Sequence, residues 1–357
     1  MTLSWAPPLG WLRGPIAGPL TDLRAAMLIR RTAPAATATL LDGSLSAWQV
    51  GERLSGGSDT TTVVLREAGG SGRSALLKAT RSRSGRAQLM RQDAVLTALH
   101  ADERLGSWRG LLPRILAAGE VNGAYCVLET RLGGDDARIV VADPDRRDLV
   151  RRGALDAIAD LHRRTARVVP VSDADLARWI REPAEVVRPV LRGAYRAALD
   201  RMVTELVTSL QDRRVAVGWV HGDYTADNVL CGPAGSATAV VDWCQADPDG
   251  LAVLDPVSFL LALDTAVHKV ELGTVVVRWL EAAGEVWGPL AEAQSGLGAD
   301  PLGRGTLALL AWLRHIATNL SKSPRYGANP VWMHRNVRAV LRHRYRQPAR
   351  ARPEPPG

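Results

Sequence analysis

The stretch WVHGDYTADNVLCGPAGSATAVVDW, residues 219–243, decides how this chain is interpreted. The apolar run 215–220 leads into it and predicts a short buried strand. Residues 228–231 and 238–242 lie on either side of Gly232-Pro233-Ala234-Gly235, a typical turn sequence. Two short apolar runs around such a turn predict a β-hairpin.

Three polar side chains of this stretch are expected to lie together. A hairpin returns its outer ends to one place, so Asn228 and Asp242 can face the same cation. Asp223 lies on the loop just before the hairpin, within reach of a hydroxyl group. Phosphoryl transfer from ATP needs a carboxylate at the hydroxyl, oxygen ligands for magnesium and a cation on the phosphates. The stretch therefore predicts phosphoryl transfer; the structural alternative is a polar turn before a buried hairpin.

The residues before this stretch predict a small β-rich region with one helix. Short β-branched runs between glycine-rich turns are typical of an antiparallel sheet, and Asn122-Gly123 is a hairpin turn. The predicted strands are 48–54, 60–66, 74–78, 115–121 and 124–130, and an amphipathic helix is predicted at 86–100.

The rest of the chain predicts mainly helices, and no internal repeat is found. Helices are expected at 148–163, 173–180, 185–211 and through most of 255–344. The expected organisation is a 1–45 extension with a helical candidate at 20–29, a sheet region 46–132, a helical region 133–345, and a basic, proline-rich and disordered tail 346–357.

Lysine is rare in this chain, which draws attention to Lys78. The sequence has only three lysines, Lys78, Lys269 and Lys322, and its other basic residues are arginines. Lys78 ends the third predicted strand. A compact ammonium suits a phosphate-binding role, whereas a lysine at a solvated strand edge is the structural alternative.

The pattern His221-x-Asp223-x-x-x-x-Asn228, followed by Val240-Val241-Asp242-Trp243, resembles the signature of the aminoglycoside phosphotransferase and choline kinase family, relatives of the protein kinases. The resemblance covers roughly residues 48–320. It implies an α+β, two-lobed protein-kinase-like fold, with a small antiparallel five-stranded N-lobe and a larger, mostly helical C-lobe.

The resemblance also implies roles for single residues. Asp223 would be the catalytic base, Asn228 and Asp242 would bind Mg2+, and His221 would be structural. Lys78 stands where kinase-like folds keep the lysine that contacts the ATP phosphates. Asp255 stands where the family has a further, usually structural, aspartate.

Contacts to the nucleotide are expected at two further places. The turn containing Gly56, Gly57 and Ser58 could cover the phosphates with backbone N–H groups, but a plain hairpin turn explains these residues equally well. By resemblance to the hinge of the family, the adenine would meet the backbone around Glu129 to Leu132, with Thr130 and Leu132 as the expected contacts.

One position departs from the family pattern. The usual partner of the lysine is a glutamate on the following helix, and Gln92 occupies its place. Either the neighbouring Asp93 substitutes, or an amide holds Lys78, or the alignment shifts by a residue.

Composition narrows the class of protein. The formal net charge of +8 is concentrated at the end: residues 313–357 carry ten basic residues and one acidic, so the preceding part is near neutral. Nucleic-acid binding is therefore disfavoured. No apolar run of membrane-spanning length and no signal peptide are found, and three cysteines without metal-ligand spacing fit a reducing cytoplasm.

The predicted function is an ATP- and Mg2+-dependent phosphotransferase acting on a hydroxyl of a small molecule, such as an aminoglycoside-like antibiotic, an amino-alcohol or a sugar. The alternative is a kinase-like nucleotide-binding regulator without catalysis. Neither the acceptor nor the oligomeric state follows from the sequence.

Overall fold

The computed structural model describes six segments of the chain, residues 27–30, 32–37, 48–54, 60–67, 74–282 and 288–345. The chain divides into two compact units. The first consists of residues 1–167 and 216–268, and the second of 168–215 and 269–357. The predicted lobe boundary at residues 132/133 falls inside the first unit, and the proposed lobe limits stay a prediction.

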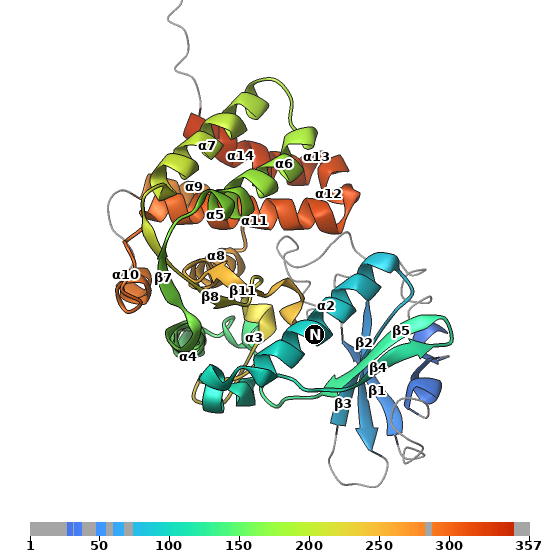
Figure 1. The fold of residues 1–357 in the computed structure, drawn as a ribbon. Helices are drawn as coiled ribbons and strands as arrows, with labels where there is room; N and C mark the ends of the chain where they lie inside the picture. The colour runs from blue at the N-terminus through green and yellow to red at the C-terminus, as the bar shows by residue number, and fades with distance from the viewer. Residues whose placement is uncertain are drawn as a thin grey trace, which may run out of the picture. The chain divides into compact units, whose positions relative to one another are not determined.

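The first unit contains the predicted five-stranded antiparallel sheet (Figure 1). Its strands lie in the order β1 (Trp48–Leu54), β2 (Thr61–Glu67), β3 (Ser74–Thr80), β5 (Ala124–Thr130) and β4 (Ile115–Val121). Asn122 and Gly123 have φ of 50° and 71°, as their two-residue hairpin turn requires. The β-rich region that the sequence predicted is therefore confirmed.

Alternation along the strands gives this sheet two buried faces. The register pairs Leu77 with Val63 and Leu128, and these side chains form one core with Ile29 and Ala33, which lie in the helical segments 27–30 and 32–37. The residues that alternate with these along the strands, Lys78 among them, point to the opposite face of the sheet. Helix α2 (Arg83–Ala101) lies across the sheet there, and its N-terminus is capped by Ser82.

The first unit continues with shorter elements that carry the predicted motif. They are η1 (Glu103–Leu111), β6 (Asp135–Asp136), α3 (Ala137–Val140), α4 (Pro144–Thr165), η4 (Ala226–Asn228), β9 (Val229–Cys231), β10 (Ala237–Val240), η5 (Trp243–Gln245), β11 (Asp247–Leu251) and α8 (Leu254–His268). Strands β7 (Arg167–Pro170) and β8 (Arg214–Val220) carry the chain out of this unit and back into it. Strand β9 pairs with β10 and β6, and β8 pairs with β11.

The second unit is helical over most of its described residues. Its elements are α5 (Asp173–Leu176), η2 (Ala177–Arg181), α6 (Glu182–Val187), η3 (Arg188–Val190), α7 (Ala194–Leu210), α9 (Leu272–Glu281), α10 (Gly288–Ser295), α11 (Arg304–Lys322), α12 (Pro324–Ala328), α13 (Pro330–Trp332), η6 (Met333–Arg338) and α14 (Ala339–Tyr345).

One predicted helix is wrong. The single helix expected at 185–211 is interrupted: α6 ends at Val187, a 3-10 turn follows, and α7 begins at Ala194. Pro189 cannot donate a backbone hydrogen bond, and Gly193 has a φ of 53°, so regular helix geometry is lost between them.

Some sequence predictions fall outside the described residues. The glycine turn with Gly56, Gly57 and Ser58 is one, and the tail 346–357 is another. Of the helical candidate 20–29, only residues 27–29 are described, and they are helical. Within the described helices, none has both the length and the apolar character that crossing a membrane demands.

Candidate active site

The β9–β10 hairpin brings the two predicted metal ligands to one place. Val229 pairs with Val240, and the backbone N–H of Val241 donates to the carbonyl of Asn228 at 2.9 Å. Asp242 follows directly. The Asn228 Nδ2 donates to the carbonyl of Asp223 at 2.8 Å. The amide nitrogen is thus committed to the loop, and the amide oxygen is the atom that can face a cation.

Asp242 adopts a conformation that few residues tolerate. Its φ of 66° and ψ of 60° lie in the left-handed region, where aspartate and asparagine are among the few acceptable non-glycine residues. The sequence predicted that a strand ends at Asp242, but β10 already ends at Val240. The left-handed turn redirects the chain into η5, where Trp243 is fully buried, whereas Asp242 itself is exposed.

His221 joins the loop to the hairpin. Its Nε2 lies 2.8 Å from the carbonyl of Val241, and the backbone N–H of Asp223 donates to its Nδ1 at 3.2 Å. A ring that donates from Nε2 and accepts at Nδ1 is neutral, with its proton on Nε2. The ring also contacts Trp243 edge-on, with centroids 4.6 Å apart. His221 therefore positions Asp223, as a structural residue would.

Asp255, in the first turn of α8, holds the start of the same loop. One carboxylate oxygen accepts from the backbone N–H of His221 at 2.7 Å, and the other accepts from Gly222 at 2.9 Å. His162 Nε2 lies 3.3 Å from the first oxygen. Gly222 has a φ of 81°, which lets two successive N–H groups turn toward one carboxylate.

A second acidic cluster beside the loop was not predicted from the sequence. Asp227 Oδ1 lies 2.9 Å from Arg138 Nε, and Arg138 also pairs with Asp136 at 3.4 Å. Burial, with the charges of Asp136 and Asp223, raises the pKa of Asp227 to about 7 against the opposing effect of Arg138. In the sequence, the only indication of this cluster was that Asp227 directly precedes Asn228. That does not indicate an arginine contributed by α3.

Lys78 lies in a closed ring of three side chains. Its Nζ is 2.9 Å from Glu129 Oε1 and 3.3 Å from Gln92 Oε1, and Gln92 Nε2 donates to Glu129 Oε2 at 2.8 Å. Burial lowers the pKa of Lys78, but the charges of Glu129 and Asp242 outweigh it, so the net shift is upward. Of the two helix residues considered from the sequence, Gln92 is therefore the one that contacts the lysine.

From the sequence, Glu129 was expected only at the start of the hinge, and its side chain was given no role. It stands in the apolar strand VLET, and its only distinguishing signal was a carboxylate between residues of strong strand preference. The backbone N–H of the neighbouring Thr130 donates to the Arg114 carbonyl at 2.9 Å, and the Thr130 hydroxyl accepts from the Arg114 N–H at 2.9 Å. Leu132 lies half-buried just after β5. Both stay predicted nucleotide contacts.

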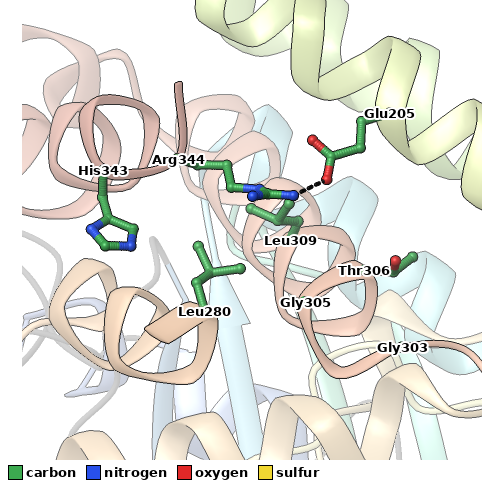
Figure 2. A pocket seen from close by; sticks show the side chains of 8 residues that line it. All are labelled: Glu205, Leu280, Gly303, Gly305, Thr306, Leu309, His343 and Arg344. Atoms are coloured by element: carbon green, nitrogen blue, oxygen red, sulfur yellow. Dashed lines mark hydrogen bonds and ion pairs between the residues drawn. The ribbon is translucent and has the colours of Figure 1, made fainter. Parts of the chain in front are cut away.

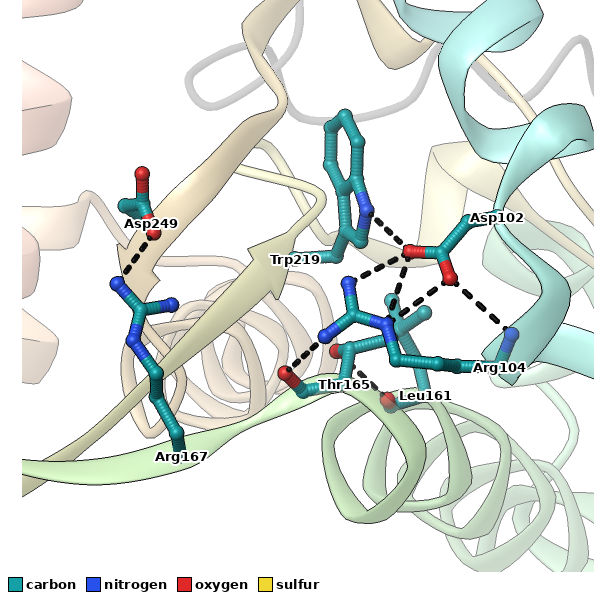
Figure 3. Close-up of polar contacts among 7 residues, drawn as sticks. All are labelled: Asp102, Arg104, Leu161, Thr165, Arg167, Trp219 and Asp249. Carbon is teal, nitrogen blue, oxygen red and sulfur yellow. Dashed lines mark hydrogen bonds and ion pairs between the residues drawn. The ribbon is translucent and has the colours of Figure 1, made fainter.

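Helix α2, which carries Gln92, is fixed at its middle and at its end, and Figure 3 shows the contacts at the end. At its end, Asp102 accepts from Trp219 Nε1 at 3.0 Å and pairs in a fork with Arg104, which also donates to the Thr165 carbonyl. In the middle, Arg91 Nη2 donates to the Ala246 carbonyl at 2.9 Å. The helix is thus tied to β8, α4 and the segment that follows Asp242.

The donor set fits magnesium and a nucleotide. Asn228 and Asp242 offer an amide and a carboxylate oxygen, and Mg2+ is usually bound by one or two such groups together with substrate phosphates and water. Among the described residues, no group of three or more His, Cys, Asp or Glu side chains could hold a metal by itself. Lys78 is the cation predicted to contact the phosphates, and its charge interacts with that of Asp242.

A cavity of about 280 Å³ lies in the second unit, and none of the predicted site residues lines it (Figure 2). Its charged groups satisfy one another: Arg344 Nη2 lies 2.5 Å from Glu205 Oε1, and Tyr345 donates to the other Glu205 oxygen. The lining residues are Glu205, Leu280, Gly303, Gly305, Thr306, Leu309, His343 and Arg344. Nothing in this lining corresponds to phosphotransfer chemistry.

Comparisons with known proteins give one family match and several solved structures of similar fold. The family model described as the phosphotransferase enzyme family matches residues 50–293. The putative fructosamine-3-kinase from Haemophilus somnus 129PT is 11% identical, with a TM-score of 0.51 over 89% of this chain and 100% of that one. The aminoglycoside phosphotransferase APH(3'')-Id from Streptomyces rimosus ATCC10970, solved with ADP and streptomycin, is 16% identical, with a TM-score of 0.47 over 82% and 98%. The comparison with curated proteins gave no match.

At such identities the solved structures inform the fold alone, and the predicted kinase-like α+β fold is confirmed. The family match spans well over half of the chain and contains the whole stretch from Lys78 to Asp255. The chain belongs to the phosphotransferase enzyme family.

Proposed function

We propose that this chain is a small-molecule kinase that transfers a phosphoryl group from ATP to a hydroxyl, with Mg2+ as cofactor. The observation that carries the proposal is the set of contacts through which Asn228 and His221 tie Asp223 to the segment of Asp242. A carboxylate, an amide oxygen and a second carboxylate are thereby held on one rigid framework. Family membership supports the phosphoryl-transfer chemistry.

Each residue has a role that follows from its chemistry. Asp223 orients the acceptor hydroxyl and takes up its proton as the new bond to phosphorus forms. Asn228 and Asp242 would hold Mg2+, which offsets charge on the phosphates when bound. Lys78 binds phosphate oxygens as a point charge. His221 and Asp255 act indirectly, because their hydrogen bonds fix the backbone on either side of Asp223.

The acceptor class is a hydroxyl compound such as an aminoglycoside-like antibiotic, an amino-alcohol or a sugar. A carboxylate base suits an alcohol, because proton transfer in the transition state needs only a modestly basic, well-placed group. We also propose a cytoplasmic location, since the chemistry consumes ATP and the three cysteines are buried thiols outside any disulfide.

The alternative function, a regulator without catalysis, was supported only by the glutamine at position 92. Because Lys78 contacts the carboxylate of Glu129 at 2.9 Å, a buried anion still accompanies the lysine. The Lys78–Glu129 contact therefore speaks against a loss of catalysis at this position. Calorimetry that detects ATP binding, together with no turnover on a broad acceptor panel, would restore the alternative.

The test is a screen followed by a matched pair of variants. Pooled antibiotics and hydroxyl metabolites are incubated with enzyme, ATP and Mg2+, and mass spectrometry identifies any compound that gains a phosphoryl group. Asp223→Asn is expected to lower kcat by at least about 1000-fold with nucleotide binding retained. Asp156→Asn, on the exposed side of α4, controls for loss of a carboxylate. Full turnover by Asp223→Asn would refute the assignment of the base.

A further inference from the structure

Glu129 is a buried carboxylate for which the scheme above has no use. It is 0% exposed, and it lies on the central part of the five-stranded sheet. A buried acid is costly unless a charge partner and hydrogen bonds accompany it. Glu129 has both, because Lys78 and Gln92 each contact one of its oxygens.

The strand register explains how this pair forms. On neighbouring strands β3 and β5, Lys78 is opposite Val127 and Leu76 is opposite Glu129. Lys78 and Glu129 therefore share one face of the sheet and are diagonal neighbours, which is within reach of two long side chains. The ion pair is internal to the sheet and needs no group from helix α2.

Gln92 adds the helix to this pair without adding charge. An amide has an acceptor and a donor, and here the acceptor faces the ammonium of Lys78 while the donor faces the carboxylate of Glu129. A glutamate at position 92 would instead confront Glu129 with a second carboxylate. The residue types at these two positions are thus complementary.

We propose that Glu129 is the positioning residue for Lys78, with Gln92 as a neutral bridge. The phosphate-binding lysine is then oriented from within the sheet rather than by a carboxylate on helix α2. This inference rests on the proposed function, because it assigns Lys78 to the nucleotide phosphates. Glu129 acts through Lys78 and is not itself a catalytic residue.

The experiment exchanges the two residue types. Glu129→Gln removes the carboxylate, Gln92→Glu adds a second one, and the double variant restores one carboxylate and one amide in exchanged places. Glu120→Gln is the matched control, since Glu120 is on strand β4 of the same sheet, 58% exposed and paired with Arg86. Glu129→Asp keeps the charge but shortens the side chain, so it replaces Glu129→Gln should that variant fail to fold.

The first measurement does not depend on turnover. Only three lysines exist, so acylation of each can be followed by peptide mass spectrometry at pH 9, with Lys269 and Lys322 as references. The groups that act on the charge of Lys78 are Glu129, Asp242 and Cys244, while burial opposes the charge. Without Glu129 the neutral amine is favoured, so Lys78 is expected to label at least about 10-fold faster in Glu129→Gln. The exchanged double variant should return to within about threefold of the wild-type rate.

The second measurement separates positioning from folding. Glu129→Gln is expected to lower kcat/KM for ATP by about 10- to 100-fold, and the exchange should recover most of that loss. A purely structural role would lower Tm in the single variants and leave kcat/KM of the folded enzyme unchanged. Wild-type labelling in Glu129→Gln, or a folded double variant without recovery of either quantity, would overturn the inference. If the wild type phosphorylates nothing, the proposed function fails, while labelling and binding of ADP still test Glu129.

Discussion

Asp255→Asn is predicted to destabilise the protein and to disturb the loop that carries Asp223. The carboxylate is 1% exposed and accepts from two successive backbone N–H groups, those of His221 and Gly222. Asparagine has nearly the same shape but only one acceptor oxygen. One buried N–H group would therefore face an NH2 group and lose its partner.

The expected loss follows from these contacts. A buried donor left without a partner costs about 1–3 kcal/mol, and loss of charge assistance on the remaining bond costs about 1 kcal/mol more. The free energy of unfolding should thus fall by about 2–4 kcal/mol, a large part of the 5–15 kcal/mol that is usual for a domain. Because the loop then shifts at Gly222, kcat should fall as well, with a smaller effect on KM for ATP.

Urea unfolding followed by tryptophan fluorescence and circular dichroism measures the change in stability. The matched control is Asp249→Asn, because Asp249 is 48% exposed and forms a surface ion pair with Arg167 at 2.8 Å (Figure 3). A pair of this kind contributes at most about 1 kcal/mol. If the free energy of unfolding of Asp255→Asn lies within about 1 kcal/mol of that of Asp249→Asn, the reasoning about the buried acceptor is refuted.

Three further predictions concern neighbouring positions. Asp242→Asn and Asp242→Ala should both abolish phosphoryl transfer. The alanine variant should lose about 1 kcal/mol more of the free energy of unfolding, because alanine tolerates the left-handed conformation poorly. Equal Tm values for the two variants would contradict this. Gly250→Ala should destabilise the protein by about 1–3 kcal/mol, because the added Cβ would lie 2.1 Å from Val220 Cγ2. Gly110→Ala is the control and should not destabilise, because a Cβ there meets nothing within 4 Å. The urea midpoints of the two variants are compared. The pKa of Asp227 is raised to about 7, chiefly by burial, so the unfolded state loses this proton first and stability contributed at low pH is lost between about pH 4 and pH 7. As the pH rises over that range, the free energy of unfolding of Asp227→Asn should therefore increase relative to that of the wild type, by at most about 4 kcal/mol. Thermal unfolding without magnesium measures this difference, and a difference that stays constant with pH would count against the raised pKa.

Local patterns made much of the fold predictable. The strands at 48–54, 115–121 and 124–130 were predicted with the bounds that the structure has, because alternation and turn residues act over a few neighbouring positions. The hairpin after Asn228 was predictable for the same reason. The helix at 185–211 was predicted wrongly, since helical periodicity outweighed the local effects of Pro189 and Gly193.

The sequence by itself determined which residues we propose for phosphotransfer, because Asp223, Asn228 and Asp242 belong to one short stretch whose geometry is set by a tight hairpin. Only the tertiary structure decided what holds Lys78. Gln92 and Glu129 are 37 positions apart, and the sequence offered no reason to join them. A buried charge takes whichever partner the strand register and the covering helix bring within reach, and that choice depends on elements distant in the chain. The stretch proposed to carry catalysis is therefore local in origin, whereas the environment of Lys78 is a property of the folded sheet.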